Sequence, residues 1–230
     1  MIGGGVAYLE DGRFIPVSAM PAGIGVPSIA GDHAENVWVS ESQGLFHLMA
    51  GKLVEQIPWA RLGRENHALS LLADASGGLW LGFVRGGGLA YFKDGQVRAS
   101  YAVADGVGEG RIPHLRLDHD GALWAATQRG LSRIKAGRVS TLSGRNGLPC
   151  DTVHWSMEDD AHSVWLYTAC GLLRIARSEL DAWAADRGAQ RSNEKRKSQW
   201  LTIVGGSATG FRGFEVVVRN GGDMCARHPA

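Results

Sequence analysis

Side chains suited to binding a ligand gather at three separate points of this sequence. Each point combines histidine with arginine, amide, carboxylate or tryptophan neighbours: Asn66, His67, Arg111, His114, Arg116, Asp151, His154 and Trp155. Aromatic rings offer a flat apolar surface to a sugar, and guanidinium groups form charge-assisted hydrogen bonds with anions. If the fold brings these points together, they predict a site for a small molecule or an oligosaccharide. The alternative interpretation is that they only contact water or satisfy the backbone of loops.

The same residues offer little for catalysis. An acid–base mechanism needs a converging pair of titratable groups, and only His114 and His154 are candidates. Ser70 and Ser156 belong to no Gly-x-Ser-x-Gly elbow or Ser-His-Asp arrangement. The glycines 86–88 lie between two predicted strands, which indicates a turn and not a phosphate-binding loop. We therefore expect a non-catalytic chain without a cofactor.

Four aspartates at regular intervals could be taken for catalytic or metal-binding carboxylates: Asp32, Asp74, Asp118 and Asp159. They occupy equivalent points of separate repeats, so we interpret them as turn caps, the commonest role of aspartate in such sequences. Asp118-x-Asp120-Gly121 resembles the opening of a calcium loop. Arg129 stands where that loop requires glutamate, so no metal site is predicted.

The elements that must position these residues follow from a repeat. Trp38, Trp80, Trp124 and Trp165 are separated by 42, 44 and 41 residues, and the aspartates above each lie six residues before them. Valine or leucine directly precedes each tryptophan, and glycine lies six residues after it. In the other three copies a leucine directly follows this glycine. The second copy carries two extra residues, so its equivalent glycine–leucine pair is Gly88–Leu89.

Each copy is typical of four short antiparallel strands. In the copy around Trp80, apolar segments 67–73, 79–83 and 88–92 and the alternating segment 96–101 are separated by turn signals such as Asp94–Gly95. Four strands every 41 to 44 residues match one β-propeller blade. A blade cannot bury both faces alone, so we expect each tryptophan in the layer between adjacent blades, with ligand stacking as the alternative.

The two ends break the pattern. Residues 1–27 repeat the second half of a blade, and residues 28–185 hold the four copies, the last of which gives way to a helix pattern capped by Ser178. Residues 186–230 are expected to be a linker and a non-repeat tail, either disordered or produced by a frameshift, with strand-like segments at 201–204 and 214–218. The fold class is therefore an all-β, incomplete propeller of about four blades with a short helix.

The motif Asp-x-x-Gly-x-Leu-Trp, followed by Gly-Leu and by a connector such as Asn146-Gly-Leu-Pro, resembles the two-component regulator propeller repeat over residues 3 to 180. The copies lack the serine and threonine of Asp-box propellers, which favours this resemblance. Such repeats usually build the extracytoplasmic sensor of a receptor that continues into a β-sandwich, a membrane helix and a histidine kinase or diguanylate cyclase. The resemblance implies a periplasmic, ligand-sensing fragment whose partners are the remaining blades and the transmitter domains.

Two other functions stay open. A propeller lyase or glycosidase would depend on His114 and His154. A protein-interaction scaffold would show an exposed apolar patch and no small-molecule pocket.

Composition excludes several classes. The formal charge of +1 gives no electrostatic basis for binding nucleic acid, and no apolar run is long enough to span a membrane. The first residues lack the basic and apolar regions of a signal peptide. Among three cysteines, Cys150 and Cys170 would emerge at the same end of a hairpin formed by residues 151–158 and 164–169, so a disulfide between them is a hypothesis.

Overall fold

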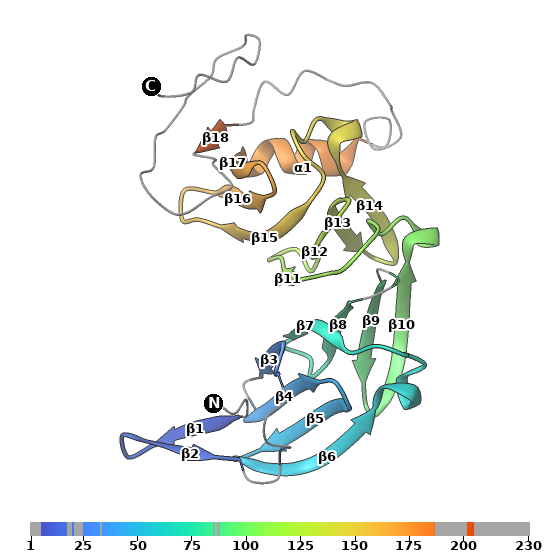
Figure 1. The fold of residues 1–230 in the computed structure, drawn as a ribbon. Helices are drawn as coiled ribbons and strands as arrows, with labels where there is room; N and C mark the ends of the chain where they lie inside the picture. Colours follow the sequence, from blue (N-terminus) through green and yellow to red (C-terminus); the bar gives the residue numbers. More distant parts are fainter. Residues whose placement is uncertain are drawn as a thin grey trace, which may run out of the picture.

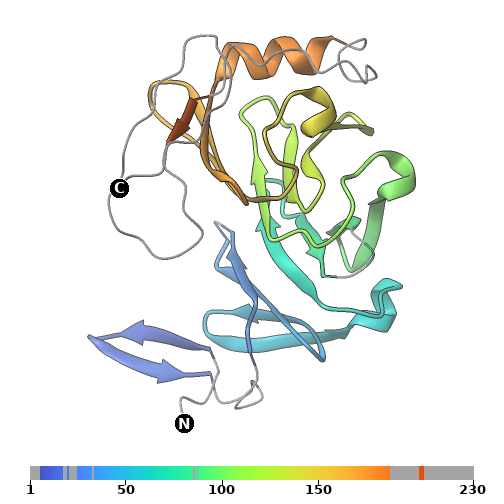
Figure 2. The same ribbon diagram turned by 45° about the horizontal axis from the view of Figure 1, so that its top comes forward.

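The computed structural model describes residues 6–17, 20, 25–32, 34–84, 86, 88–186 and 202–204. These residues form one two-stranded hairpin, four four-stranded antiparallel sheets and one short α-helix (Figure 1). The sheets follow one another around an open arc, which is clearest when the molecule is turned (Figure 2). The prediction of an incomplete all-β propeller is confirmed.

Strand order within each sheet follows the chain. The hairpin consists of β1 (Ala7–Glu10) and β2 (Arg13–Pro16). The first sheet contains β3 (Ser28–Gly31), β4 (Asn36–Glu41), β5 (Gly44–Met49) and β6 (Lys52–Pro58). The second contains β7 (Ala68–Ala73), β8 (Leu79–Phe83), β9 (Gly88–Lys93) and β10 (Gln96–Ala102). The third contains β11 (His114–Leu117), β12 (Leu123–Thr127), β13 (Gly130–Lys135) and β14 (Arg138–Leu142). The fourth contains β15 (Val153–Glu158), β16 (Ser163–Thr168), β17 (Gly171–Ala176) and β18 (Thr202–Val204).

The turn between the first two strands is built in the same way in three of the sheets. Asp74 Oδ1 accepts hydrogen bonds from the backbone N–H groups of Ser76 and Gly78, at 2.8 and 2.9 Å. Asp32 and Asp159 accept from the equivalent groups two and four residues later. These carboxylates therefore shape turns, because they satisfy amides that the tight bend leaves without a backbone partner.

A second turn joins the third and fourth strands of the first three sheets. It places a residue with positive φ before a glycine with positive φ, a combination that matches the twist of a hairpin. The pairs are Ala50–Gly51, Asp94–Gly95 and Ala136–Gly137, and Asp11–Gly12 forms the same turn between β1 and β2. The hairpin therefore has the form of the second half of a sheet.

The hydrophobic core lies in layers between consecutive sheets. Trp124 is fully buried in a cluster with Val153, Val164 and Leu166 of the fourth sheet. Trp80 packs on the cluster between the second and third sheets, and Trp38 meets the ring of Phe92 edge-on at 5.7 Å. These tryptophans hold neighbouring sheets together.

The first strands of successive sheets are also joined by polar contacts. The backbone N–H of Leu71 in β7 donates to Ser28 Oγ in β3 at 3.0 Å, and Ser70 Oγ donates to the carbonyl of Ile112, just before β11, at 2.8 Å. The backbone N–H of Ser156 in β15 lies 3.4 Å from His114 Nδ1 in β11. Strands β3, β7, β11 and β15 therefore lie side by side across the sheet boundaries.

The fourth copy ends differently. Helix α1 (Arg177–Ala185) follows β17 and buries Leu180 and Trp183 in the same cluster as Trp124. The N-cap is Ala176, not Ser178 as the sequence predicted, so no side chain caps the helix. The strand expected at 201–204, in the segment assigned to a tail, is present as β18 and pairs with β17 as its outer neighbour. The other strand expected in this tail, at 214–218, lies outside the described residues.

Two tryptophans make equivalent hydrogen bonds but differ in burial, so their replacement by alanine should lower the free energy of unfolding by unequal amounts. Trp124 and Trp165 each donate from Nε1 to the aspartate six residues earlier, at 2.8 and 2.7 Å, but only Trp124 is fully buried between two sheets. Trp124→Ala should lower the free energy of unfolding by about 3–5 kcal/mol. Trp165→Ala should cost clearly less. Urea denaturation measures both, and equal losses would contradict the layered core.

Candidate functional site

The eight residues predicted to bind a ligand do not form one cluster. Asn66, His67, Arg111 and Asp151 lie in or beside the connections that lead into β7, β11 and β15. His114 begins β11, His154 and Trp155 lie in β15, and Arg116 lies near the far end of β11. The structure therefore divides them into residues of the connections, residues of the first strands, and Arg116, which lies near the C-terminal end of its strand.

His114 and His154 contact different aromatic partners. The His114 ring lies 6.2 Å from that of Trp155, and its Nδ1 faces the backbone N–H of Ser156. Burial, aided by the nearby charge of Arg116, lowers the pKa of His114, which favours the neutral imidazole that can accept this hydrogen bond. The His154 ring lies 5.2 Å from that of Tyr167. Among the described residues, no hydrogen bond joins the two imidazoles.

The connection residues have individual roles. Asp151 Oδ1 accepts a hydrogen bond of 2.6 Å from the backbone N–H of Gly144, so this carboxylate organises the loop before β15. Arg111 has an exposed side chain, and its backbone N–H donates to Gln128 Oε1 at 3.3 Å. Asn66 lines an open pocket of about 610 Å³ together with Arg64 and Phe83.

Arg116 belongs to a network of ion pairs between the third and fourth sheets. Arg177 Nη1, at the start of α1, donates at 2.8 Å to both Asp118 Oδ1 and Glu158 Oε2. Arg116 Nη1 lies 3.6 Å from the same Asp118 oxygen and 3.4 Å from the same Glu158 oxygen. Arg177 Nε also donates to Asp181 within the helix, at 2.9 Å. The network joins β11, β15 and α1 by charge.

The turn of the third copy differs from the other three because its repeated aspartate takes part in this network. Asp118 Oδ2 accepts from the Trp124 indole, while Oδ1 faces Arg177, so Asp120 Oδ1 instead accepts from the backbone N–H of Ala122 at 2.9 Å. Burial raises the pKa of Asp118, but the hydrogen bonds from Arg177 and Trp124 and the charge of Arg116 outweigh it and hold this pKa below its ordinary value.

Asp120 is held as an anion by basic neighbours. Its Oδ2 lies 2.9 Å from Arg133 Nη2 and also pairs with Lys135. Burial raises its pKa, but the Lys135 and Ala122 hydrogen bonds and both positive charges lower it to about 2. These pairings could not be predicted from the sequence alone, because Arg133, Lys135 and Arg177 are separated from the motif along the chain.

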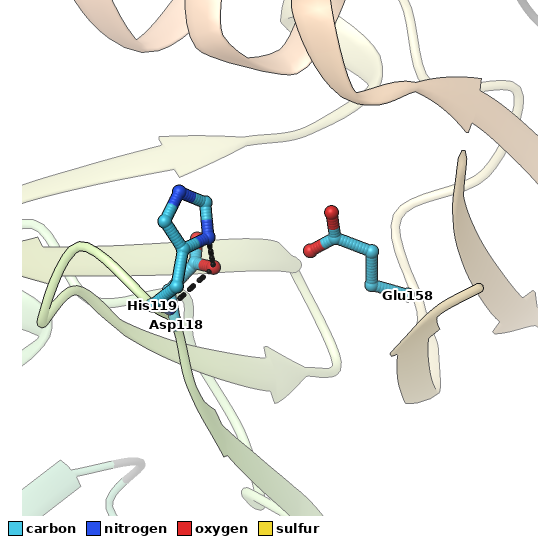
Figure 3. Close-up of side chains that lie close together, drawn as sticks. All are labelled: Asp118, His119 and Glu158. Atoms are coloured by element: carbon cyan, nitrogen blue, oxygen red, sulfur yellow. Dashed lines mark hydrogen bonds and ion pairs between the residues drawn. The ribbon is translucent and has the colours of Figure 1, made fainter. Parts of the chain in front are cut away.

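Three side chains of the network could be mistaken for a metal site. Figure 3 shows Asp118, His119 and Glu158, whose ligand atoms lie within 4.8 Å of one another. His119 is exposed, with Nδ1 3.1 Å from Asp118 Oδ1. However, the Arg177 guanidinium already lies 2.8 Å from both carboxylates, in the position that a cation would take. The geometry therefore corresponds to an ion-pair network, since a metal ion would have to displace this guanidinium.

Cys150 and Cys170 form a disulfide, with Cα atoms 6.1 Å apart. Cys150 lies in the connection before β15, and Cys170 lies in the turn between β16 and β17. Thr168 Oγ1 lies 3.6 and 3.5 Å from the two sulfur atoms and donates to the carbonyl of Gly171. The disulfide closes the gap between a connection and the turn that it faces.

Comparison with known proteins gives a fold but no family. No protein-family model matches the chain, and no curated protein sequence does. Among solved structures, the extracellular domain of a protein described as a hybrid two-component system from B. thetaiotaomicron has a TM-score of 0.62 at 21% identity, covering 76% of this chain and 23% of that one. A catalytically inactive virginiamycin B lyase from Staphylococcus aureus, with quinupristin, has a TM-score of 0.58 at 16% identity, covering 73% of this chain and 58% of the lyase.

A third similar structure is PorZ, a surface component of the type-IX secretion system of Porphyromonas gingivalis. Its TM-score is 0.57 at 14% identity, covering 82% of this chain and 28% of that one. At these identities the likeness establishes the propeller fold alone. The chain spans less than a quarter of the two-component domain and under two thirds of the lyase.

Removing Arg177 should destabilise the fold strongly. Asp118 has only 1% of its side chain exposed, so Arg177→Met leaves a buried carboxylate without its closest cation. The expected loss in the free energy of unfolding is about 3–5 kcal/mol. The exposed pair Arg98–Asp94 supplies the control, since Arg98→Met should cost no more than about 0.5 kcal/mol.

A double variant separates lost charge from lost packing in this experiment. Asp118→Asn together with Arg177→Met removes the unpaired charge and should recover part of the stability. Thermal unfolding measures each variant, and a single variant as stable as the wild type would show that the network is not formed.

Proposed function

We propose that the chain is part of a ligand-sensing propeller in the extracytoplasmic portion of a two-component-type receptor, and that it is itself non-catalytic. The observation that carries the proposal is an apolar face of the fourth sheet that no other described element covers. On this face Trp155, Met157 and Tyr167 have 37, 41 and 50% of their surface exposed. They lie on adjacent strands, because Trp155 pairs with Tyr167 and Met157 pairs with Trp165.

The same three positions are used for contact between sheets in the earlier copies. Four residues before the repeated aspartate, Ser28, Ser70 and His114 each form a hydrogen bond with the next sheet or its leading segment. The equivalent residue of the fourth sheet is Trp155. Its exposed ring therefore stands where the earlier copies bind a neighbour.

The positions equivalent to Met157 and Tyr167 also contact the next sheet in the earlier copies. Two residues before the aspartate, Ala30 and Leu72 pack in the layers between sheets, and Arg116 pairs with Glu158 of the following sheet. Two residues after the tryptophan, Ser40 Oγ donates to the carbonyl of Ala68 and Ala126 is fully buried. Their equivalents on the fourth sheet are Met157 and Tyr167. The open face has the pattern that accepts a further sheet of the same kind.

We take the following sheet of one longer receptor polypeptide as the occupant of this face. The two-component extracellular domain, of which this chain spans 23%, supports this choice by its greater length. An interaction scaffold would also present exposed apolar residues. The equivalence with contact positions inside the chain favours a sheet of the repeat over an unrelated protein.

Two further observations support the remaining parts of the proposal. A disulfide such as Cys150–Cys170 is typical of oxidising compartments, which supports an extracytoplasmic location. His114 is engaged between strands and His154 packs on Tyr167, which supports structural roles for the pair that an acid–base mechanism would use. No helix among the described residues has the length and apolar character needed to cross a bilayer.

The open face predicts self-association of the isolated chain. Burying exposed apolar surface of this kind against a second copy is favourable, so sedimentation velocity should show larger species as the protein concentration rises. Trp155→Ser combined with Tyr167→Ser should remain monomeric and folded, with the free energy of unfolding lowered by about 1–3 kcal/mol, because the two rings are only partly exposed and contact His114 and His154.

Phe14→Ser is the matched control. Phe14 lies on β2 and is 78% exposed, and its replacement should leave the association unchanged. If the double variant associates as the wild type does, the fourth sheet is not the contact face.

The receptor context is tested by the coding sequence on either side of these residues. We expect further Asp-x-x-Gly-x-Leu-Trp copies in the same reading frame, followed by a membrane helix and a histidine kinase or diguanylate cyclase. Flanking sequence that contains neither repeats nor a transmitter domain would contradict the proposed function.

A further inference from the structure

The three connections between consecutive sheets are built on one plan, with one exception in side-chain chemistry. Each begins with a short 3-10 turn that ends at a glycine with positive φ: Gly63, Gly106 and Gly147. The next residue then donates its backbone N–H to the carbonyl five residues earlier. In the second and third connections this residue is Val107 or Leu148, which are 2% and 4% exposed. In the first connection it is Arg64.

The turn that faces the first connection also departs from the repeat. Three residues after the tryptophan, the other sheets carry a polar side chain that closes the turn to the third strand: Glu41, Thr127 and Thr168. The second sheet has Phe83 there, followed by a loop with two extra residues before β9. Both departures meet at the pocket of about 610 Å³ lined by Gly63, Arg64, Glu65, Asn66, Phe83 and Gly86.

The Arg64 guanidinium is held rigidly in this pocket. Its Cζ lies 4.6 Å from the centre of the Phe83 ring, and its Nη2 donates to the carbonyl of Leu89 at 3.3 Å and to Ser100 Oγ at 3.1 Å. Phe83 is itself fixed by Trp59, whose ring meets it edge-on at 6.0 Å and whose Nε1 donates to the carbonyl of Glu41. The cation is therefore preorganised by packing.

Arg64 lacks an acidic partner among the described residues. Its Nη2 contacts neutral oxygens, while Nε and Nη1 form neither an ion pair nor a hydrogen bond within the described part of the chain. Burial alone lowers the pKa of Arg64, with no carboxylate raising it in return. A half-buried charge without a counterion is costly, and an anionic ligand would offset that cost.

We propose that this pocket binds the anionic group of a small molecule, with Arg64 as its cation and Asn66 as a neighbouring polar contact. The assignment rests on the proposed sensing role, whose ligand class it names. The volume lies within the range of small-molecule sites, roughly 300–1,000 Å³. The equivalent gap of the fourth sheet is closed by the Cys150–Cys170 disulfide, and Cys150 occupies the position of Asn66, three residues after the glycine.

Isothermal titration of the purified chain with glucuronate and with glucose tests the proposal, since this pair differs by one carboxylate. We expect binding of glucuronate but not of glucose, and competition by inorganic sulfate or phosphate. Arg64→Leu should weaken glucuronate binding by about 10-fold to 100-fold, as expected for the loss of charge-assisted hydrogen bonds. Glu65→Gln should strengthen it, because this variant removes a negative charge from the pocket lining.

Arg64→Leu is designed to fold. It restores the apolar residue type found in the other two connections, so its free energy of unfolding should equal or exceed that of the wild type. Arg61→Leu is the matched control, since Arg61 lies on the same 3-10 turn and its exposed side chain pairs with Glu55. It should leave glucuronate binding unchanged.

Equal binding of glucose and glucuronate, or unchanged binding in Arg64→Leu, would overturn the assignment. So would the failure of glucuronate, sulfate and phosphate to bind the wild type at about 10 mM, well above the concentrations at which a specific pocket binds its ligand. The proposed function is judged separately by the flanking repeats and the transmitter domain. Their presence together with failed anion binding would remove this inference alone.

Discussion

A four-stranded sheet of this repeat has two apolar faces and cannot bury both of them alone, and the rest of the structure depends on this constraint. Each sheet is stabilised by a layer that it shares with the next. The layers contain Trp38, Trp80 and Trp124, and hydrogen bonds between neighbouring first strands accompany them. The same constraint explains the exposed rings of Trp155 and Tyr167, which occupy contact positions on a sheet that has one face uncovered among the described residues.

The repeated aspartate shows how a local motif can be adapted to a tertiary demand. In three copies it caps its own turn. In the third sheet Asp118 is buried next to Arg177, and Asp120 accepts the hydrogen bond from the backbone N–H of Ala122 instead. A carboxylate with 1% of its side chain exposed requires a cation, and α1 supplies it. The helix is thereby fixed by charge as well as by the burial of Leu180 and Trp183. The closest match to the repeat motif in sequence is thus the least typical turn in structure.

The proposed anion site lies where the sequence departs from the repeat. Residues that obey the pattern form turns, layers and contacts between sheets. Three of the eight ligand-binding residues expected from the sequence have such structural roles: Asp151 organises a loop, Arg116 forms ion pairs and His114 links two strands. The pocket at Arg64 is different, because an arginine replaces a buried apolar residue where the facing loop is longer. Asn66 is the sequence-predicted residue that lies there.

The sequence alone determined the strand count of a copy, its turns and the order of the sheets, because the spacing of tryptophan, aspartate and glycine is set by local geometry: hairpin turns need positive φ, and strands alternate their faces. It indicated a strand at 201–204, but it could not predict that this strand pairs with β17, because a partner that lies beyond an intervening helix leaves no periodic signal. Nor could it pair Asp118 with Arg177, 59 residues away, or place Arg64 over Phe83. Those contacts depend on how consecutive sheets pack, and only the tertiary structure decides which side chains meet across that boundary.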